Sequence, residues 1–284
     1  MIRRLLGSPD DSIPSMEHVT LIILAIVLYL CASGAFSLRL ARQGDSPPAA
    51  RTAALGMGLL AIAVHAVVLW GQTVLPQGLN LGFFTAGSLV TWLMAALILI
   101  AALRKPVENL AVVILPISAV ALILSTVFAP AAPTGGNVPL GLEAHILSSI
   151  LAYSLLSIAA LQALVLAYQD HHLHNRHPEG LIRLLPPLRV METLLFQMLW
   201  LGFGLLTLSL VTGAIFLEDI FGQHLVHKTT LSIAAWLVFA ILLFGRWRYG
   251  WRGRTAIRWT LGGFIALMLA YFGTKLVLEL ILFR

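Results

Sequence analysis

The sequence is poor in charged residues and in cysteine. Only 11% of its 284 residues are Asp, Glu, Lys or Arg, whereas soluble domains carry about 25%. So few charged side chains cannot cover the surface of a soluble protein of this length, which excludes an ordinary soluble fold. The single cysteine, Cys31, excludes an internal disulfide, a cysteine-based zinc site and a C-x-x-C-H cofactor-attachment motif.

The common catalytic signatures are also missing. The chain has no Walker A loop, no GxSxG elbow, no HExxH pair and no C-x-x-C pair. The net charge is +6, but the 18 basic residues lie in small separate clusters, whereas a nucleic-acid-binding surface needs one basic face. We therefore expect a protein that is not an enzyme and that has no nucleic-acid partner.

Long apolar runs are what the sequence does have, and 59% of its residues are hydrophobic. A helix of roughly 20 apolar residues crosses the 30 Å hydrocarbon layer of a membrane. Eight runs qualify or nearly qualify, at 19–38, 52–75, 81–103, 110–129, 144–168, 194–216, 229–245 and 259–283. The seventh run is short, and we expect its helix to begin earlier, near His224. Pro116 interrupts the fourth run, where a neighbouring helix can bond with the carbonyl group that proline leaves unpaired.

These runs predict an all-α fold, a polytopic membrane bundle of eight transmembrane helices in a single domain, 1–284. Thirteen of the 18 basic residues lie on alternate loops, while the loops between them carry almost none. Because Lys and Arg mark cytoplasmic loops, both termini should lie outside, with residues 1–17 along the outer interface.

His65 is the ionisable residue that lies deepest in a predicted span. It is ten residues from the end of the second run, a distance of about 15 Å along a helix. Small residues such as Gly58 and Ala61 share its helix face, so His65 should face protein rather than lipid. Two interpretations of His65 remain. In the structural one it forms a hydrogen bond between helices, and in the functional one it is a haem ligand or a proton relay.

Two further histidines open predicted spans at the outer side of the membrane. His145 opens the fifth span and His227 the seventh, each above a stripe of small or hydroxyl residues. Two imidazoles at one depth on different helices could hold a flat cofactor such as haem. The alternative is a pair of interfacial histidines bonded to water or lipid headgroups. A third group, His171 to His177, could bind a divalent metal, but nearby arginines oppose a cation and favour a solvated loop.

Four stretches of the sequence form a recognisable pattern. They are HKTTLSIAAW at 227–236, GWRG at 250–253, LAYFG at 269–273, and a stretch at 144–163 that begins AHIL. In these stretches the chain resembles the cytochrome c assembly protein family, which includes the haem-handling CcsA and CcmC proteins, and most of all its YpjD/HemX-like branch. The resemblance is strongest from residue 144 onward, and it implies a family-like helical core at 81–284.

The resemblance implies non-covalent binding of a b-type haem near the outer face of a bacterial inner membrane. His145 matches a haem-ligand histidine of the family, and His227 is a positional candidate for a second ligand to the haem iron. His224 is an alternative to His227, since i and i+3 share a helix face. Lys228 could pair with a haem propionate, and His65 is the remaining candidate for cofactor binding.

We therefore predict a membrane protein that binds or handles haem in cytochrome c assembly or a related haem-linked process. Its expected partners are the lipid bilayer, haem and other membrane or cytochrome-assembly proteins. Family members that deliver haem carry a tryptophan-rich outer segment, but the corresponding residues here, 218–226, contain no tryptophan. This absence favours one alternative, a cofactor-less accessory subunit of another membrane complex. A second alternative is a transporter of haem or a small solute with a path past His65.

Overall fold

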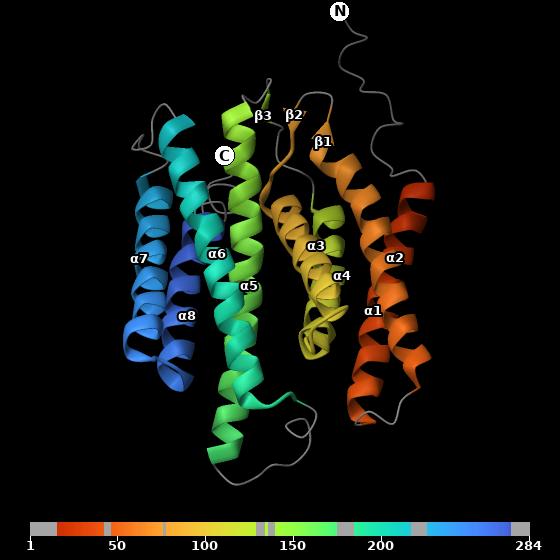
Figure 1. The fold of residues 1–284 in the computed structure, drawn as a ribbon. Coiled ribbons are helices and arrows are strands. Elements are labelled where there is room, and N and C mark those ends of the chain that lie inside the picture. The colour runs from red at the N-terminus through yellow and green to blue at the C-terminus, as the bar shows by residue number, and fades with distance from the viewer. Residues whose placement is uncertain are drawn as a thin grey trace, which may run out of the picture.

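The described part of the chain forms a bundle of eight long helices (Figure 1). The computed structural model describes residues 16–42, 47–75, 78–128, 134–135, 140–174, 185–216 and 226–273. All eight helices are long and apolar enough to cross a membrane, which confirms the predicted all-α membrane bundle. The helices are α1 (Met16–Ala41), α2 (Pro48–Thr73), α3 (Phe83–Ala102), α4 (Glu108–Val127), α5 (Leu140–His174), α6 (Leu188–Phe216), α7 (Val226–Tyr249) and α8 (Gly253–Met268).

Helices α5, α6 and α8 differ most from their predicted bounds: α5 covers 140–174 where 144–168 was predicted, and α6 begins at Leu188 where a start at 194 was predicted. α7 begins at Val226, which confirms a start before residue 229, and the residues around His224 lie outside the described part of the chain. α8 begins at Gly253, not at residue 259 as predicted. The reason is a tight turn between the helices, in which Gly250 and Gly253 have φ values of 68° and 55°. Glycine adopts this left-handed region at little cost. α8 then continues as a π-helix, η3 (Leu269–Gly273).

A small antiparallel sheet at one end of the bundle was not predicted. It consists of β1 (Val74–Leu75), β2 (Gly78–Leu79) and β3 (Thr134–Gly135), in the order β1-β2-β3. Each strand has two residues, which is too short for an alternating pattern to show in the sequence. The sheet joins the loop before α3 to the loop after α4.

The helices form two groups that lie side by side (Figure 1). α1 to α4 pack on one another, α5 to α8 pack on one another, and α3 contacts α5 between the groups. Glycines allow close approach where helices meet. A Cβ atom on Gly58 would lie 2.7 Å from Leu99, and one on Gly202 would lie 2.8 Å from Leu156. Small residues at such contacts are typical of membrane helix packing.

Pro116 lies inside α4 and has no N–H group to donate to the carbonyl of Val112. The hydroxyl of Ser33, on α1, donates to that carbonyl over 2.9 Å. The prediction that a neighbouring helix satisfies the freed carbonyl is therefore confirmed. This bond also fixes the rotation of α1 against α4.

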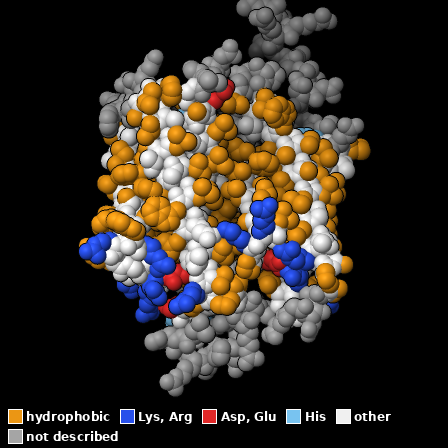
Figure 2. Space-filling model, in the orientation of Figure 1, with side chains coloured by type: hydrophobic (Ala, Val, Ile, Leu, Met, Phe, Trp, Pro, Cys, Tyr) orange, Lys and Arg blue, Asp and Glu red, His pale blue; other side chains and the backbone are white. Residues whose placement is uncertain are grey.

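Basic side chains gather at the lower end of the bundle, below a belt of hydrophobic side chains (Figure 2). α1 and α7 both carry arginine in their last turn. The sheet lies at the opposite end (Figure 1). This separation is what the alternation of basic loops predicts, and the direction of the bundle across the membrane stays a prediction.

The pairing of Ser33 with Pro116 can be tested by a double-mutant cycle. We expect Ser33→Ala to lower the free energy of unfolding by about 1 kcal/mol, because the Val112 carbonyl loses its partner in a medium without water. In a Pro116→Ala background the restored N–H group satisfies the carbonyl, so the same substitution should cost much less. Unfolding in mixed detergent micelles measures both values. Ser157→Ala is the control, since among the described residues the Ser157 hydroxyl bonds only the Tyr153 carbonyl of its own helix. Equal costs of Ser33→Ala in the two backgrounds would contradict this account.

Cysteine labelling tests the orientation. In a Cys31→Ser background, we expect a membrane-impermeant maleimide to label Thr134→Cys on intact cells and to leave Asn175→Cys unlabelled. The reason is that β3 belongs to a loop almost free of Lys and Arg, whereas residue 175 lies in a basic loop. Permeabilised cells should label both variants, which checks that both sites react. The reverse pattern on intact cells would show that the termini are cytoplasmic.

Candidate functional site

His145 is held in one orientation between two helices. It lies in the second turn of α5 and is partly buried, and its Nδ1 atom is 2.8 Å from the backbone carbonyl of Ser209 on α6. A carbonyl oxygen only accepts hydrogen bonds, so Nδ1 carries the proton. In the neutral ring, Nε2 then has a lone pair that can bind a metal ion. Histidine ligands commonly have this arrangement, in which a backbone carbonyl fixes the ring through the other nitrogen.

Serine side chains next to His145 join the same two helices. The Ser149 hydroxyl lies 2.6 Å from the His145 carbonyl and 2.6 Å from the Ser209 hydroxyl. The Ser148 hydroxyl donates to the Ala144 carbonyl over 2.8 Å. The predicted stripe of hydroxyl residues below His145 is therefore a contact between α5 and α6. Its effect is to keep the Ser209 carbonyl where it can orient the imidazole.

His227 is the second residue of α7, but its side chain lies outside what the structure describes, as does all of His224. α5 and α7 begin at the same end of the bundle, opposite the basic end (Figure 1). Both residues therefore belong to first or second turns of helices that start at this end. Lys228 follows on α7 and is partly buried. Whether the rings of His145 and His227 face a common space stays a prediction.

His65 lies on the other helix group and is completely buried. Its Nδ1 atom is 3.0 Å from the Tyr29 hydroxyl of α1, and its Nε2 atom is 3.0 Å from the Ser88 hydroxyl of α3. The expectation that His65 faces protein is confirmed. Both ring nitrogens are used within the protein, which is the pattern of an interhelical hydrogen bonder. A role for His65 in cofactor binding stays a prediction.

Sequence reasoning missed the two partners of His65. Tyr29 and Ser88 are each one of several polar residues within a long apolar run. Their polarity was the available signal. Which of several such residues would face His65 depends on how α1, α2 and α3 are rotated, and periodicity in one helix does not reveal that.

The histidine cluster 171–177 falls only partly within the described residues. His172 bonds the Tyr168 carbonyl of its own helix through Nδ1, over 2.9 Å. Among the described residues, no three His, Cys, Asp or Glu side chains are grouped so that they could hold a metal ion. The side chains of His174 and His177 lie outside that part of the chain.

A buried carboxylate explains the GWRG stretch, and sequence reasoning missed it too. Glu192, near the start of α6, accepts a hydrogen bond from the backbone N–H of Gly253 over 2.9 Å. Its Oε1 atom is also 3.8 Å from the Arg246 guanidinium, which donates to the Trp251 carbonyl over 3.0 Å. These contacts hold the turn between α7 and α8 against α6. The stretch therefore has a structural role at the basic end, away from His145.

Comparisons with known proteins place these features in context. Residues 54–282 match the family described as Cytochrome C assembly protein. The chain is 34% identical over 234 residues to the inner membrane protein YpjD of Escherichia coli, and this alignment covers 81% of the chain and 88% of YpjD. The chain is also 32% identical over 89 residues to the cytochrome c biogenesis protein CcsA of Rippkaea orientalis, and this alignment covers 31% of the chain and 26% of CcsA. No solved structure matches the chain.

Substitution of His65 separates its two possible roles. We expect His65→Ala to lower the free energy of unfolding by about 2 kcal/mol, because the buried Tyr29 and Ser88 hydroxyls both lose a partner. Glutamine has a donor and an acceptor, so His65→Gln should recover at least half of this loss. Unfolding in mixed micelles measures the difference. If His65→Gln instead abolishes haem binding as completely as Ala, with helices intact by circular dichroism, His65 is at the cofactor.

Proposed function

Because the chain belongs to the cytochrome c assembly protein family, we propose that it binds haem without a covalent bond and handles it within the membrane. The observation that carries this proposal is the hydrogen bond from His145 Nδ1 to the Ser209 carbonyl. It leaves the Nε2 lone pair as the coordinating group of a fixed imidazole. A histidine that only bonds water or lipid headgroups at the membrane surface does not require a buried backbone carbonyl to orient its ring.

The residues around His145 fit a haem group. Ser209 is buried and its carbonyl orients the ring, and such supporting bonds raise the basicity of a histidine ligand. Haem would supply an iron ion that binds imidazole nitrogen. We assign His145 and His227 as the residues that would hold the iron, with His224 as the alternative to His227. Lys228, beside His227, is assigned to a haem propionate, because an ammonium group favours a carboxylate.

We place this site near the outer face of a bacterial inner membrane. The relative YpjD is an inner membrane protein, and the site lies at the end of the bundle opposite the basic side chains. The proposed process is cytochrome c assembly or a related haem-linked task. The proposal covers the binding and handling of haem and assigns no catalytic step.

A second candidate function is that of an accessory subunit without a cofactor. One sequence observation favours it: residues 218–226 contain no tryptophan, although haem-delivering relatives are expected to have a tryptophan-rich segment there. In that case His145 and Ser209 would only join α5 to α6. Co-purification of the protein with a stoichiometric partner and without pigment would select this candidate.

Absorption spectroscopy tests the haem proposal. We expect the purified protein to show a Soret band, either as isolated or after addition of haem. His145→Ala should lower the affinity for haem by at least about tenfold, because the fixed ligand is removed. His172→Ala is the matched control, since this ring also bonds a backbone carbonyl through Nδ1 but lies at the other end of α5. A protein that stays colourless after haem addition, or a His145→Ala variant with unchanged affinity, would overturn the proposal.

A further inference from the structure

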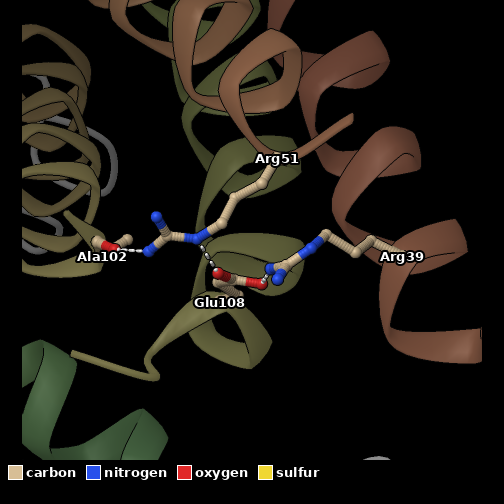
Figure 3. A network of polar contacts seen from close by, with 4 residues as sticks. All are labelled: Arg39, Arg51, Ala102 and Glu108. Carbon is tan, nitrogen blue, oxygen red and sulfur yellow. Dashed lines mark hydrogen bonds and ion pairs between the residues drawn. The ribbon is translucent and has the colours of Figure 1, made fainter. Parts of the chain in front are cut away.

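One carboxylate at the basic end holds two guanidinium groups that come from different helices (Figure 3). Glu108 is the first residue of α4. Its Oε1 atom accepts a hydrogen bond from Nε of Arg51 over 2.8 Å, and its Oε2 atom accepts one from Nη1 of Arg39. Arg51 also donates through Nη2 to the carbonyl of Ala102 at the end of α3. We call Arg39, Arg51 and Glu108 the arginine cluster.

The arginine cluster carries an excess positive charge. Two guanidinium charges meet one carboxylate, which leaves one positive charge uncompensated. Within the described part of the chain, neither arginine has another carboxylate partner. Each guanidinium has five N–H donors, and the contacts named here use one donor of Arg39 and two of Arg51. With respect to the residues that the structure describes, further donors on both side chains are therefore available to an anion.

The contact of Glu192 in the other helix group shows that joining helices does not require such an excess. There one carboxylate faces one guanidinium, that of Arg246, and a backbone N–H group. The charges balance, and the contact still holds α6 against the turn between α7 and α8. A second arginine on Glu108 is thus more than helix packing needs.

The arginine cluster lies where the apolar surface of the bundle ends. The side chain of Glu108 is 11% exposed, whereas those of Arg39 and Arg51 are 26% and 31% exposed. The carboxylate is thus largely buried, and the two arginine side chains are partly exposed. Leu38, next to Arg39, and Leu103, next to Ala102, are 62% and 52% exposed and suit contact with lipid chains. In Figure 2, most basic side chains of this face gather toward its lower end, and Lys and Arg at helix ends commonly lie where the lipid headgroups begin.

We propose that Arg39 and Arg51 bind the phosphate of an anionic phospholipid from the adjoining leaflet. Guanidinium groups bind phosphate oxygens through paired N–H donors. Glu108 lies between the two groups (Figure 3), so the remaining donors of each guanidinium are available to phosphate oxygens at this end of the bundle. The net charge of the arginine cluster favours a lipid with a net negative charge over a zwitterionic one, whose own cation would be repelled. Basic sites between membrane helices on the cytoplasmic side commonly bind anionic headgroups.

Binding of defined lipids to the purified full-length protein tests this proposal. Native mass spectrometry from a mild detergent measures the affinity for phosphatidylglycerol and for phosphatidylcholine. We expect the protein to bind one phosphatidylglycerol at least about fivefold more tightly than phosphatidylcholine. Arg39→Gln and Arg51→Gln should each remove most of this selectivity. Arg104→Gln is the matched control: it removes the same charge from an exposed residue at the same end and should leave the selectivity nearly unchanged.

Arg39→Lys keeps the positive charge but lacks the planar set of N–H donors of a guanidinium group. If the Gln variants fail to fold, this variant tests whether the arginine cluster binds lipid phosphate. We expect it to lower phosphatidylglycerol affinity by about threefold and to leave that for phosphatidylcholine unchanged. If Arg39→Lys and the folded Gln variants keep wild-type selectivity, the arginine cluster only joins helices and the proposal is wrong. If excess inorganic phosphate displaces phosphatidylglycerol, the site is one for free phosphate and the lipid assignment is overturned.

Discussion

The interior of a membrane offers polar groups no water, and this constraint shapes every contact that joins the helices of the protein. A hydroxyl, imidazole or carbonyl in the hydrocarbon layer must find its partner on its own helix or on a neighbour. The Ser33 hydroxyl meets the carbonyl freed by Pro116, His65 meets two hydroxyls, and the Trp236 indole donates to the Thr207 hydroxyl over 2.9 Å. Apolar contact alone would let helices rotate against each other, because lipid and protein surfaces are equally apolar. These bonds therefore select one arrangement.

The same constraint separates two kinds of chemistry to opposite ends of the bundle. Charged groups are stable only where lipid headgroups and water begin. At the basic end, Glu108 binds Arg51 and Glu192 binds the backbone N–H of Gly253. His145 lies toward the opposite end, on a helix that joins both groups through α3. The Ser154 hydroxyl, on α5, lies 3.4 Å from the Val90 carbonyl of α3. The proposed haem site and the proposed lipid site are thus far apart in the fold and rest on different helices.

The stretches that carry the family resemblance do not all serve one site. GWRG forms the turn between α7 and α8, where Trp251 packs on Trp259 with ring centroids 5.6 Å apart. LAYFG is the π-helix η3, and its Phe272 packs on Tyr153 of α5 and on Phe83 of α3, which joins the two helix groups. Both stretches are therefore explained by packing. The stretch around His145 instead contains the fixed imidazole on which the haem proposal rests.

The sequence by itself determined the number of helices, most of their bounds and the end at which basic residues gather. These properties depend on the length of each apolar run and on the charges beside it, which are local. Tertiary structure alone decided that His65 faces Tyr29 and Ser88, that the Ser209 carbonyl fixes the tautomer of His145, and that two arginines share Glu108. The reason is physical. In a soluble helix a polar stripe marks the outer face, but here both the lipid side and the core side are apolar, so the sequence does not show how each helix is rotated. Hydrogen-bond partners follow from that rotation, and only packing of the whole bundle sets it.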